Sequence, residues 1–466
     1  MGNKLLFLSL VLINSLFVGV LYVTFDDLPG NLSDIRSRHL RHAGIYPYVS
    51  SSSDIGVGMG SGGTLGQALT EALEEAGKSS RLRNPAFAIL SFSQDHDLGS
   101  FLKTARSALG AETQIFGWAS LADGIITNQG YERQDRTGGS DSRQLVSAML
   151  FHSENIAFGV GAASFSDFDT VEQAAQAAIR QSMKNAGRTG SEKPQAVIIA
   201  PGFGHEEKVI HGIEEIIGRE TPILGGSTYA SICGTADRDT LVTEGVTVAT
   251  MYTSLPVGWI FEGGVDAITT QGGEITRVEG MKILEIDHRP AAEVYDEWND
   301  YQVRPMAANE LLNDQLREHI ILNPLCQKFF TPSGQAYVLF FSLLPDFTEG
   351  SLKVGVNLKE GDRVYLGHSS WEAQMNQIVN LPYHARLQQQ VSAERQIKFG
   401  FGYLCAGVLK IIPDTEKEKI PRLLHHANDA APFLIGTSSG EQGNFPGIGN
   451  KHGHLLASYL VVGSKE

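Results

Sequence analysis

The sequence predicts an α/β fold with duplicated strand–helix–strand–helix–strand units in an N-terminal half and a C-terminal α+β half that contains a third, related unit. The main observation is a repeat. Matching residues of the two copies are each 108 positions apart by subtraction: Phe101 and Val209, Leu109 and Ile217, and Gly117 and Gly225. A period of this length is too long for a solenoid repeat and suits a duplicated half-domain. The alternation of strand and helix patterns is typical of layered α/β proteins.

The first copy is expected over about residues 55–151. Its opening segment Ile55–Ser61 is rich in glycine, and we interpret it as a turn. Apolar residues then recur at the i, i+3, i+4 spacing of a helix that ends at Gly77. The remaining elements are an apolar strand at Ala86–Phe92, a helix at about Leu98–Leu109 and a return strand at Leu145–Phe151.

The second copy, over about residues 156–264, repeats this order. It has a glycine-containing segment at Phe158–Ser164, a helix from Val171 to Gly187, a strand at Ala196–Ala200, a helix at Glu206–Ile217 and a return strand at Gly245–Tyr252.

After Gly264 the pattern changes. Residues 335–367 alternate apolar runs with Asp and Gly turns, which is typical of a meander. The α/β unit then returns a third time in divergent form. The expected elements of this half are a strand at Lys282–Ile286, a helix at Pro290–Trp298, the meander, a strand at Gly402–Ile411, a helix at Glu416–Ala427, an apolar segment at Pro432–Ser439 and a return strand at Leu455–Val462.

The N-terminal segment is different in kind. Leu5–Phe25 is an almost unbroken apolar run of 21 residues, which is long enough to cross a bilayer, and no small-residue cleavage site follows it. We therefore expect residues 1–25 to be a single-pass membrane anchor, with a cleaved signal segment and a secreted protein as the alternative. Residues 26–54 are polar and are interpreted as a tether. The flanking charges leave open on which side of the membrane the main body lies.

Composition narrows the classes of function. The formal net charge of -15 argues against a nucleic-acid-binding protein, since phosphate affinity comes from clustered Lys and Arg. The three cysteines are far apart, which implies no disulfide framework, and no Cys/His spacing indicates structural zinc. No cofactor is expected.

Four segments together resemble the FIST family (F-box and intracellular signal transduction proteins). They are Pro222–Thr228, Leu241–Ala249, Lys282–Tyr295, and Ile435–Glu441 with Asn444 and Phe445. The resemblance implies a FIST N-like domain over 55–264 and a FIST C-like domain over 282–466. It also implies a sensory module for small ligands, amino acids among them, that acts in signal transduction. One departure is that Ser227-Thr228 is not followed by the glutamate common in the family, whereas Gly440-Glu441 keeps it.

Three segments of glycine followed by small hydroxyl residues come after predicted strands. At such positions in α/β sheets, backbone N–H groups and hydroxyls can hold a carboxylate or phosphate. The alternative is that these glycines only turn the chain tightly. The candidate ligand-binding residues are Gly225, Gly226, Ser227, Thr228, Gly436, Thr437, Ser438, Ser439, Glu441, Gly117 and Ser120.

Other motifs carry less weight. Gly56–Gly62 lacks the Lys-Ser/Thr pair of a phosphate-binding loop. Gly436–Gly440 matches the Gly-x-Ser-x-Gly pattern of hydrolases, but too little chain follows to supply the other members of a triad. Cys233 is a possible nucleophile or a small buried hydrophobe. The histidines at 425–426 and 452–454 lack a carboxylate or cysteine at a spacing that completes a metal site.

These patterns predict a membrane-tethered sensory protein that binds an amino acid or a similar small anionic or zwitterionic metabolite and acts by conformational change. No catalytic residue, metal or nucleic-acid partner is expected, and the signalling partner is not identified by the sequence. The alternative is a hydrolase or acyl-transfer enzyme that uses Ser438 or Cys233, and a scaffold that only docks proteins is a third class.

Overall fold

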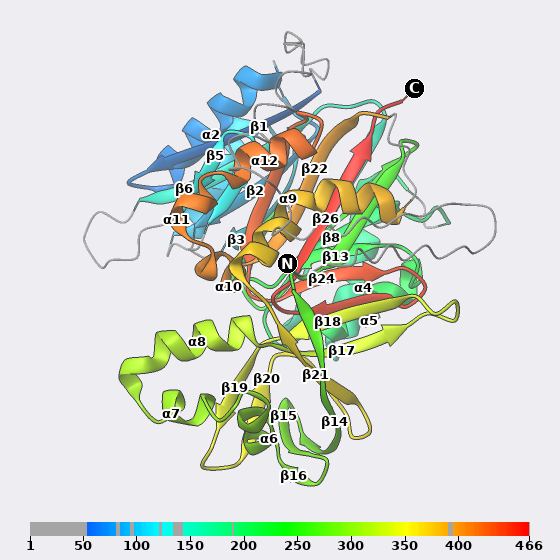
Figure 1. Cartoon of the computed structure of the whole chain (residues 1–466). Coiled ribbons are helices and arrows are strands. Elements are labelled where there is room, and N and C mark those ends of the chain that lie inside the picture. The colour runs from blue at the N-terminus through cyan, green and yellow to red at the C-terminus, as the bar shows by residue number, and fades with distance from the viewer. Residues whose placement is uncertain are drawn as a thin grey trace, which may run out of the picture. The chain divides into compact units, whose positions relative to one another are not determined.

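The computed structural model describes residues 54–80, 84–93, 97–120, 124–133, 143–188, 191–389 and 395–465. These residues form a mixed α/β fold, which confirms the predicted fold class, with three six-stranded sheets and one eight-stranded sheet (Figure 1). The expected membrane segment, and all of the expected tether except Asp54, lie outside the described residues. Among the described residues, no helix has the length and apolar character needed to cross a membrane.

Three units of the chain each supply four strands to one six-stranded sheet, and within each set only two neighbouring strands run parallel. The first unit contains β1 (Ile55–Gly62), α2 (Leu65–Ser80), β2 (Phe87–Ser93), α3 (Leu98–Leu109), β3 (Gln114–Ser120) and β6 (Gln144–Phe151). The second contains β7 (Ile156–Ser164), α4 (Val171–Asn185), β8 (Ala196–Pro201), α5 (Glu206–Ile217), β9 (Ile223–Gly226) and β12 (Gly245–Thr253). The third contains β13 (Val257–Glu262), α9 (Trp371–Gln388), β22 (Ile397–Cys405), α10 (Ala406–Ile411), α11 (Asp414–Lys417), α12 (Ile420–Ala427), β23 (Phe433–Ser438) and β26 (Ala457–Gly463).

The three sheets are completed by exchanged hairpins. Each unit has a hairpin after its third strand: β4–β5 (Ile125–Thr127 and Gly130–Glu132), β10–β11 (Ser231–Gly234 and Asp239–Val242) and β24–β25 (Glu441–Phe445 and Gly449–Gly453). The first unit's hairpin pairs with β23 of the third unit, the second unit's with β3 of the first, and the third unit's with β9 of the second. The exchange is therefore cyclic, and every six-stranded sheet contains strands from two units.

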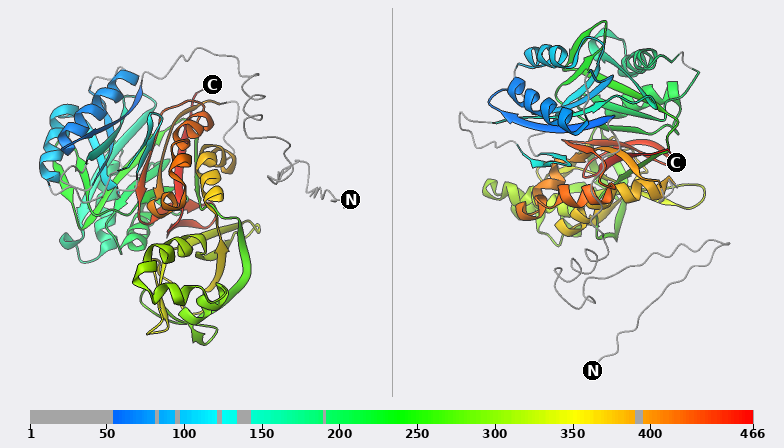
Figure 2. Two further views of the ribbon diagram at one scale, coloured as in Figure 1. Left: turned by 60° about the vertical axis from the view of Figure 1, so that its left-hand side comes forward. Right: turned by 90° about the horizontal axis from the view of Figure 1, so that it is seen from above.

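The inner faces of the three sheets share one aromatic core. Phe87 and Phe158 stack with ring centroids 4.1 Å apart, and Phe151 meets Phe399 at 5.1 Å, so the contacts join all three units. The helices pack on the outer faces of the sheets in separate clusters. Figure 2 shows the blue helices of the first unit and the orange helices of the third on opposite outer sides, with strands between them.

The segment interpreted as a glycine-rich turn is the regular strand β1, so that prediction was wrong. A Cβ atom added to Gly58 would lie 2.0 Å from the carbonyl oxygen of Ala72, and one on Gly159 would lie 2.0 Å from that of Ser182. In the third unit, a Cβ on Gly258 would lie 2.6 Å from the carbonyl oxygen of Ala385. These glycines let a helix approach the first strand of its unit closely, which is the role that they share.

The third unit differs from its prediction in its boundaries. We expected residues up to 264 to belong with the second copy, but β13 pairs with β26 and is the first strand of the third unit. The predicted strand Gly402–Ile411 ends at Cys405 and continues as helix α10, and the predicted helix Glu416–Ala427 is divided into α11 and α12.

The eight-stranded sheet is inserted into this unit between β13 and α9 (yellow-green, lower part of Figure 1), and we call it the inserted sheet. It includes the predicted meander. Its elements are β14 (Ala267–Glu279), β15 (Lys282–Ile286), β16 (Arg289–Pro290), α6 (Ala291–Trp298), α7 (Val303–Ala307), α8 (Asn313–Leu322), β17 (Leu325–Phe330), β18 (Ala336–Phe341), β19 (Leu343–Asp346), β20 (Ser351–Val354) and β21 (Arg363–His368).

We expect Gly159→Ala to lower the free energy of unfolding by about 1–3 kcal/mol, because the added methyl group meets helix backbone that cannot give way. The matched control is Gly77→Ala, where nothing lies within 4 Å of the added atom and α2 gains helix propensity. Urea unfolding of both variants measures the difference. Equal stability of Gly159→Ala and the wild type would contradict the close-packing role.

Candidate functional site

The three hydroxyl-bearing segments predicted as ligand loops meet in the interior. The Ser120 hydroxyl donates to the Thr437 carbonyl oxygen at 3.1 Å, across the first and third units. The Thr228 hydroxyl donates to the Ala119 carbonyl oxygen at 2.8 Å, and the Ser227 N–H donates to the Gly440 carbonyl oxygen. The segments therefore converge as expected, but they hydrogen-bond to one another.

The glycines of these segments are needed for the same convergence. A Cβ on Gly117 would lie 2.8 Å from Ile232, one on Gly225 2.4 Å from Gln442 and one on Gly436 2.2 Å from Trp118. Gly226, Ser227, Thr228, Thr437 and Ser438 are also buried, and Ser439 is exposed. A direct role of these residues in ligand binding stays a prediction.

Glu441, the glutamate kept from the family motif, is fully buried next to Ser438. Its carboxyl group accepts hydrogen bonds from the Ser438 hydroxyl at 2.9 Å and from the N–H groups of Gly440 and Leu456. Burial is the larger effect, and it raises the pKa of Glu441 to about 8 despite these donors. The residue is therefore an acid that holds its proton near neutral pH.

The two residues of the enzyme alternative, Ser438 and Cys233, are both buried. Burial raises the pKa of the Cys233 thiol to about 12, so it is not a thiolate at neutral pH. The Ser438 hydroxyl donates to the carboxyl group of Glu441, and among the described residues no histidine forms a hydrogen bond with Ser438. The same residues hold no group of three or more His, Cys, Asp or Glu side chains placed to bind a metal.

A chain of hydrogen-bonded polar side chains runs from the converging segments to residues Glu206 and His452, which line a cavity. The Ser227 hydroxyl donates to Glu206 at 2.8 Å and accepts from the Gln442 side-chain amide at 3.1 Å. The same amide lies 3.1 Å from Nδ1 of His452. Glu206 and His452 are 7% and 4% exposed, and both line a cavity, so the chain connects the buried center with the cavities described next.

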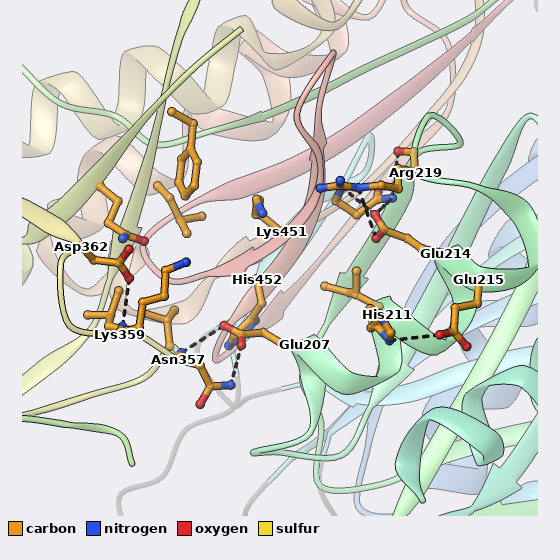
Figure 3. A pocket seen from close by; sticks show the side chains of 17 residues that line it. Glu207, His211, Glu214, Glu215, Arg219, Asn357, Lys359, Asp362, Lys451 and His452 are labelled. Carbon is orange, nitrogen blue, oxygen red and sulfur yellow. Dashed lines mark hydrogen bonds and ion pairs between the residues drawn. The ribbon is translucent and has the colours of Figure 1, made fainter. Parts of the chain in front are cut away.

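Two cavities open along α5. The larger, of about 820 Å³, lies between α5, strands β17 and β18, residues 356–359 and β25 (Figure 3). The smaller, of about 170 Å³, lies at the first turn of α5. Both are lined by Glu207, Val356, Asn357 and His452, so they are neighbours. The volume of the larger is in the range of small-molecule sites.

The carboxylates of the larger cavity have protein partners. Glu214 accepts from the backbone and side chain of Asn450 and lies 3.8 Å from Arg219. Glu207 accepts from Asn357, and Glu215 lies 3.7 Å from His211. Figure 3 shows Glu207 reaching from the green helix to Asn357, and Glu215 pointing to His211 of the same helix.

Lys451 differs from these carboxylates because it has no ion pair within the described part of the chain. Its ammonium lies 5.2 Å from the center of the Phe329 ring, and Leu339 and Leu358 also line the cavity. No dashed line reaches Lys451 in Figure 3. Burial lowers the pKa of Lys451, and nearby Arg219 lowers it further. A half-buried ammonium that forms no ion pair with the described residues therefore lies beside an apolar wall, with Glu214 and Glu207 acting on it only from a distance.

No motif in the sequence indicates this cavity. Its residues come from α5, the inserted sheet and β25, which are far apart in the chain. Of the residues that line it, only His452 was a candidate from the sequence, as one of the histidines at 452–454 that lack the partners of a metal site.

Comparison with known proteins gives a family match for part of the chain. The FIST N domain model matches residues 86–289, and no curated protein matches the chain. Among solved structures, the chain is similar to a cyanuric acid hydrolase described in terms of structural concatenation, at 8% identity and a TM-score of 0.31, covering 88% of this chain and 99% of that one. A cyanuric acid hydrolase from A. caulinodans gives 9%, 0.30, 88% and 99%.

We expect the wild type to lose stability relative to Glu441→Gln as pH rises from about 4.5 to about 8. In that window the folded state holds a proton that the unfolded chain has released, so the free energy of unfolding falls with pH, at most by about 1.4 kcal/mol per unit. Urea unfolding at several pH values measures it. The exposed control Glu310→Gln should track the wild type, and parallel curves for Glu441→Gln and the wild type would contradict the assignment.

Proposed function

We propose that this chain is a sensory protein that binds a small anionic or zwitterionic metabolite in the larger cavity beside α5. FIST domains are linked to signal transduction and small-ligand sensing, and the FIST N domain model matches residues 86–289. The observation that carries the proposal is Lys451, a half-buried ammonium with no ion pair among the described residues. Burying a charge is costly unless a partner compensates it, and a ligand carboxylate supplies that partner.

The neighbouring carboxylates limit the ligand's charge. Glu207 and Glu214 act on Lys451 through space and would also repel a strongly negative ligand. A monocarboxylate with an apolar part, or one that also carries a positive group, fits this combination. Phe329 and Leu339 would contact its apolar part, and binding would be read out through the contacts between α5 and the inserted sheet.

We expect Lys451→Met to weaken binding of carboxylate ligands by at least about tenfold, since a charge-assisted bond is lost. Thermal-shift screening of the wild type against organic acids and amino acids finds the ligands, because any true ligand raises the melting temperature with concentration. Titration calorimetry then compares the variants, with the exposed Lys103→Met as the matched control. Equal affinities of Lys451→Met and the wild type, or no response of the wild type to any acid, would contradict the proposal.

We further propose that residues 282–466 form the FIST C-like domain. The first strand of its α/β unit, β13, would then come from the segment before residue 282.

We also propose that residues 5–25 anchor the chain in a membrane. The support for the anchor is the 21-residue apolar run. We expect the full chain to stay in the membrane fraction after alkaline carbonate washing and a variant lacking residues 1–25 to remain soluble. Release of the full chain by the wash would contradict the anchor.

A further inference from the structure

The smaller cavity contains a buried charge of opposite sign to Lys451. Glu206 is 7% exposed and lines this cavity of about 170 Å³ together with Gly204, His205 and His452. One carboxylate oxygen, Oε1, accepts from Ser227. Oε2 has no hydrogen bond, and Glu206 has no ion pair with a Lys or Arg, within the described residues. The exposed Lys208 at the rim is also unpaired with it.

The hydrogen bonds around Glu206 run in one direction. The Gln442 amide donates to Ser227 and to the Gly440 carbonyl oxygen and lies 3.1 Å from Nδ1 of His452, and Ser227 donates to Glu206. The Glu206 carboxylate therefore accepts one hydrogen bond, from Ser227 at Oε1, and its Oε2 can accept a hydrogen bond from a group in the cavity. A ligand ammonium has the charge and the donors that this oxygen lacks.

The two charges without an ion pair line different cavities. Among the described residues, Glu206 lines the smaller cavity and not the larger, and Lys451 lines the larger cavity and not the smaller. The two cavities meet at Glu207, Asn357, Val356 and His452. In an α-amino acid the ammonium and the carboxylate are attached to the same carbon, whereas an ω-amino acid holds them apart and can place one in each cavity.

We propose that the ligand is an ω-amino carboxylate, with its ammonium at Glu206 in the smaller cavity and its carboxylate at Lys451 in the larger one. Its methylene spacer passes the Glu207–Asn357 contact and packs against Val356 and the apolar wall. This inference rests on the proposed function, because it takes the carboxylate site at Lys451 as given and adds the second site.

The test is titration calorimetry on the full chain with matched probes: hexanoate, hexylamine, leucine, and the ω-amino acids from 4-aminobutanoate to 8-aminooctanoate. We expect the best ω-amino acid to bind at least about tenfold more tightly than hexanoate, with an optimum in chain length. Glu206→Gln keeps the shape and the bond from Ser227, and should reduce the affinity for that ω-amino acid to the level of hexanoate while leaving hexanoate binding unchanged. Glu215→Gln removes a carboxylate from the larger cavity alone and should keep the preference.

The outcomes separate the two proposals. Hexanoate binding that depends on Lys451, without any gain from the amine, overturns this inference and leaves the proposed function standing. Leucine binding as tightly as the best ω-amino acid, or Glu206→Gln weakening hexanoate equally, also overturns it. No binding of any probe overturns both. The wild-type probe series decides the inference by itself if Glu206→Gln does not fold.

Discussion

The exchange of hairpins is the constraint on which the rest of the structure depends. Every backbone N–H and C=O group of a buried strand needs a partner, and β3, β9 and β23 each find theirs on a hairpin or strand of another unit. A single unit would leave that strand edge unpaired, and the aromatic contact of Phe151 with Phe399 would be missing. The three units are therefore expected to fold as one cooperative structure.

The same exchange builds the candidate site. Hairpin β24–β25 of the third unit lies beside β9 of the second, which brings Asn450 against Glu214 of α5 and places Lys451 and His452 on the cavity wall. The inserted sheet supplies the opposite wall through Phe329 and Leu339. The cavity is thus lined by three separate parts of the chain: α5, the inserted sheet and β25.

Much of the fold could be predicted because local pattern determines it. The repeat located α5 correctly at Glu206–Ile217 and β12 within one residue of its end, since apolar periodicity reflects which face is buried. Gly58 and Gly159 misled the prediction because glycine serves turns and close packing alike. The exchange could not be predicted, since nothing in a four-residue strand such as Ser231–Gly234 identifies its partner. The cavity was missed for the same reason, because α5 and β25 come together only after the exchange, where Asn450 meets Glu214.

Hairpin β24–β25 shows that this fold can satisfy polar groups when they serve structure. Asn450 donates to Glu214 and to the Thr221 carbonyl oxygen and accepts from the Ile223 N–H. Lys451, the next residue, is left with an aromatic ring and no counter-ion in the described chain. Replacing a buried charge by an apolar side chain is often neutral or stabilising, so stability alone does not account for a lysine here. The proposed binding role of its ammonium accounts for a charge that lies beside the Asn450 network and takes no part in it.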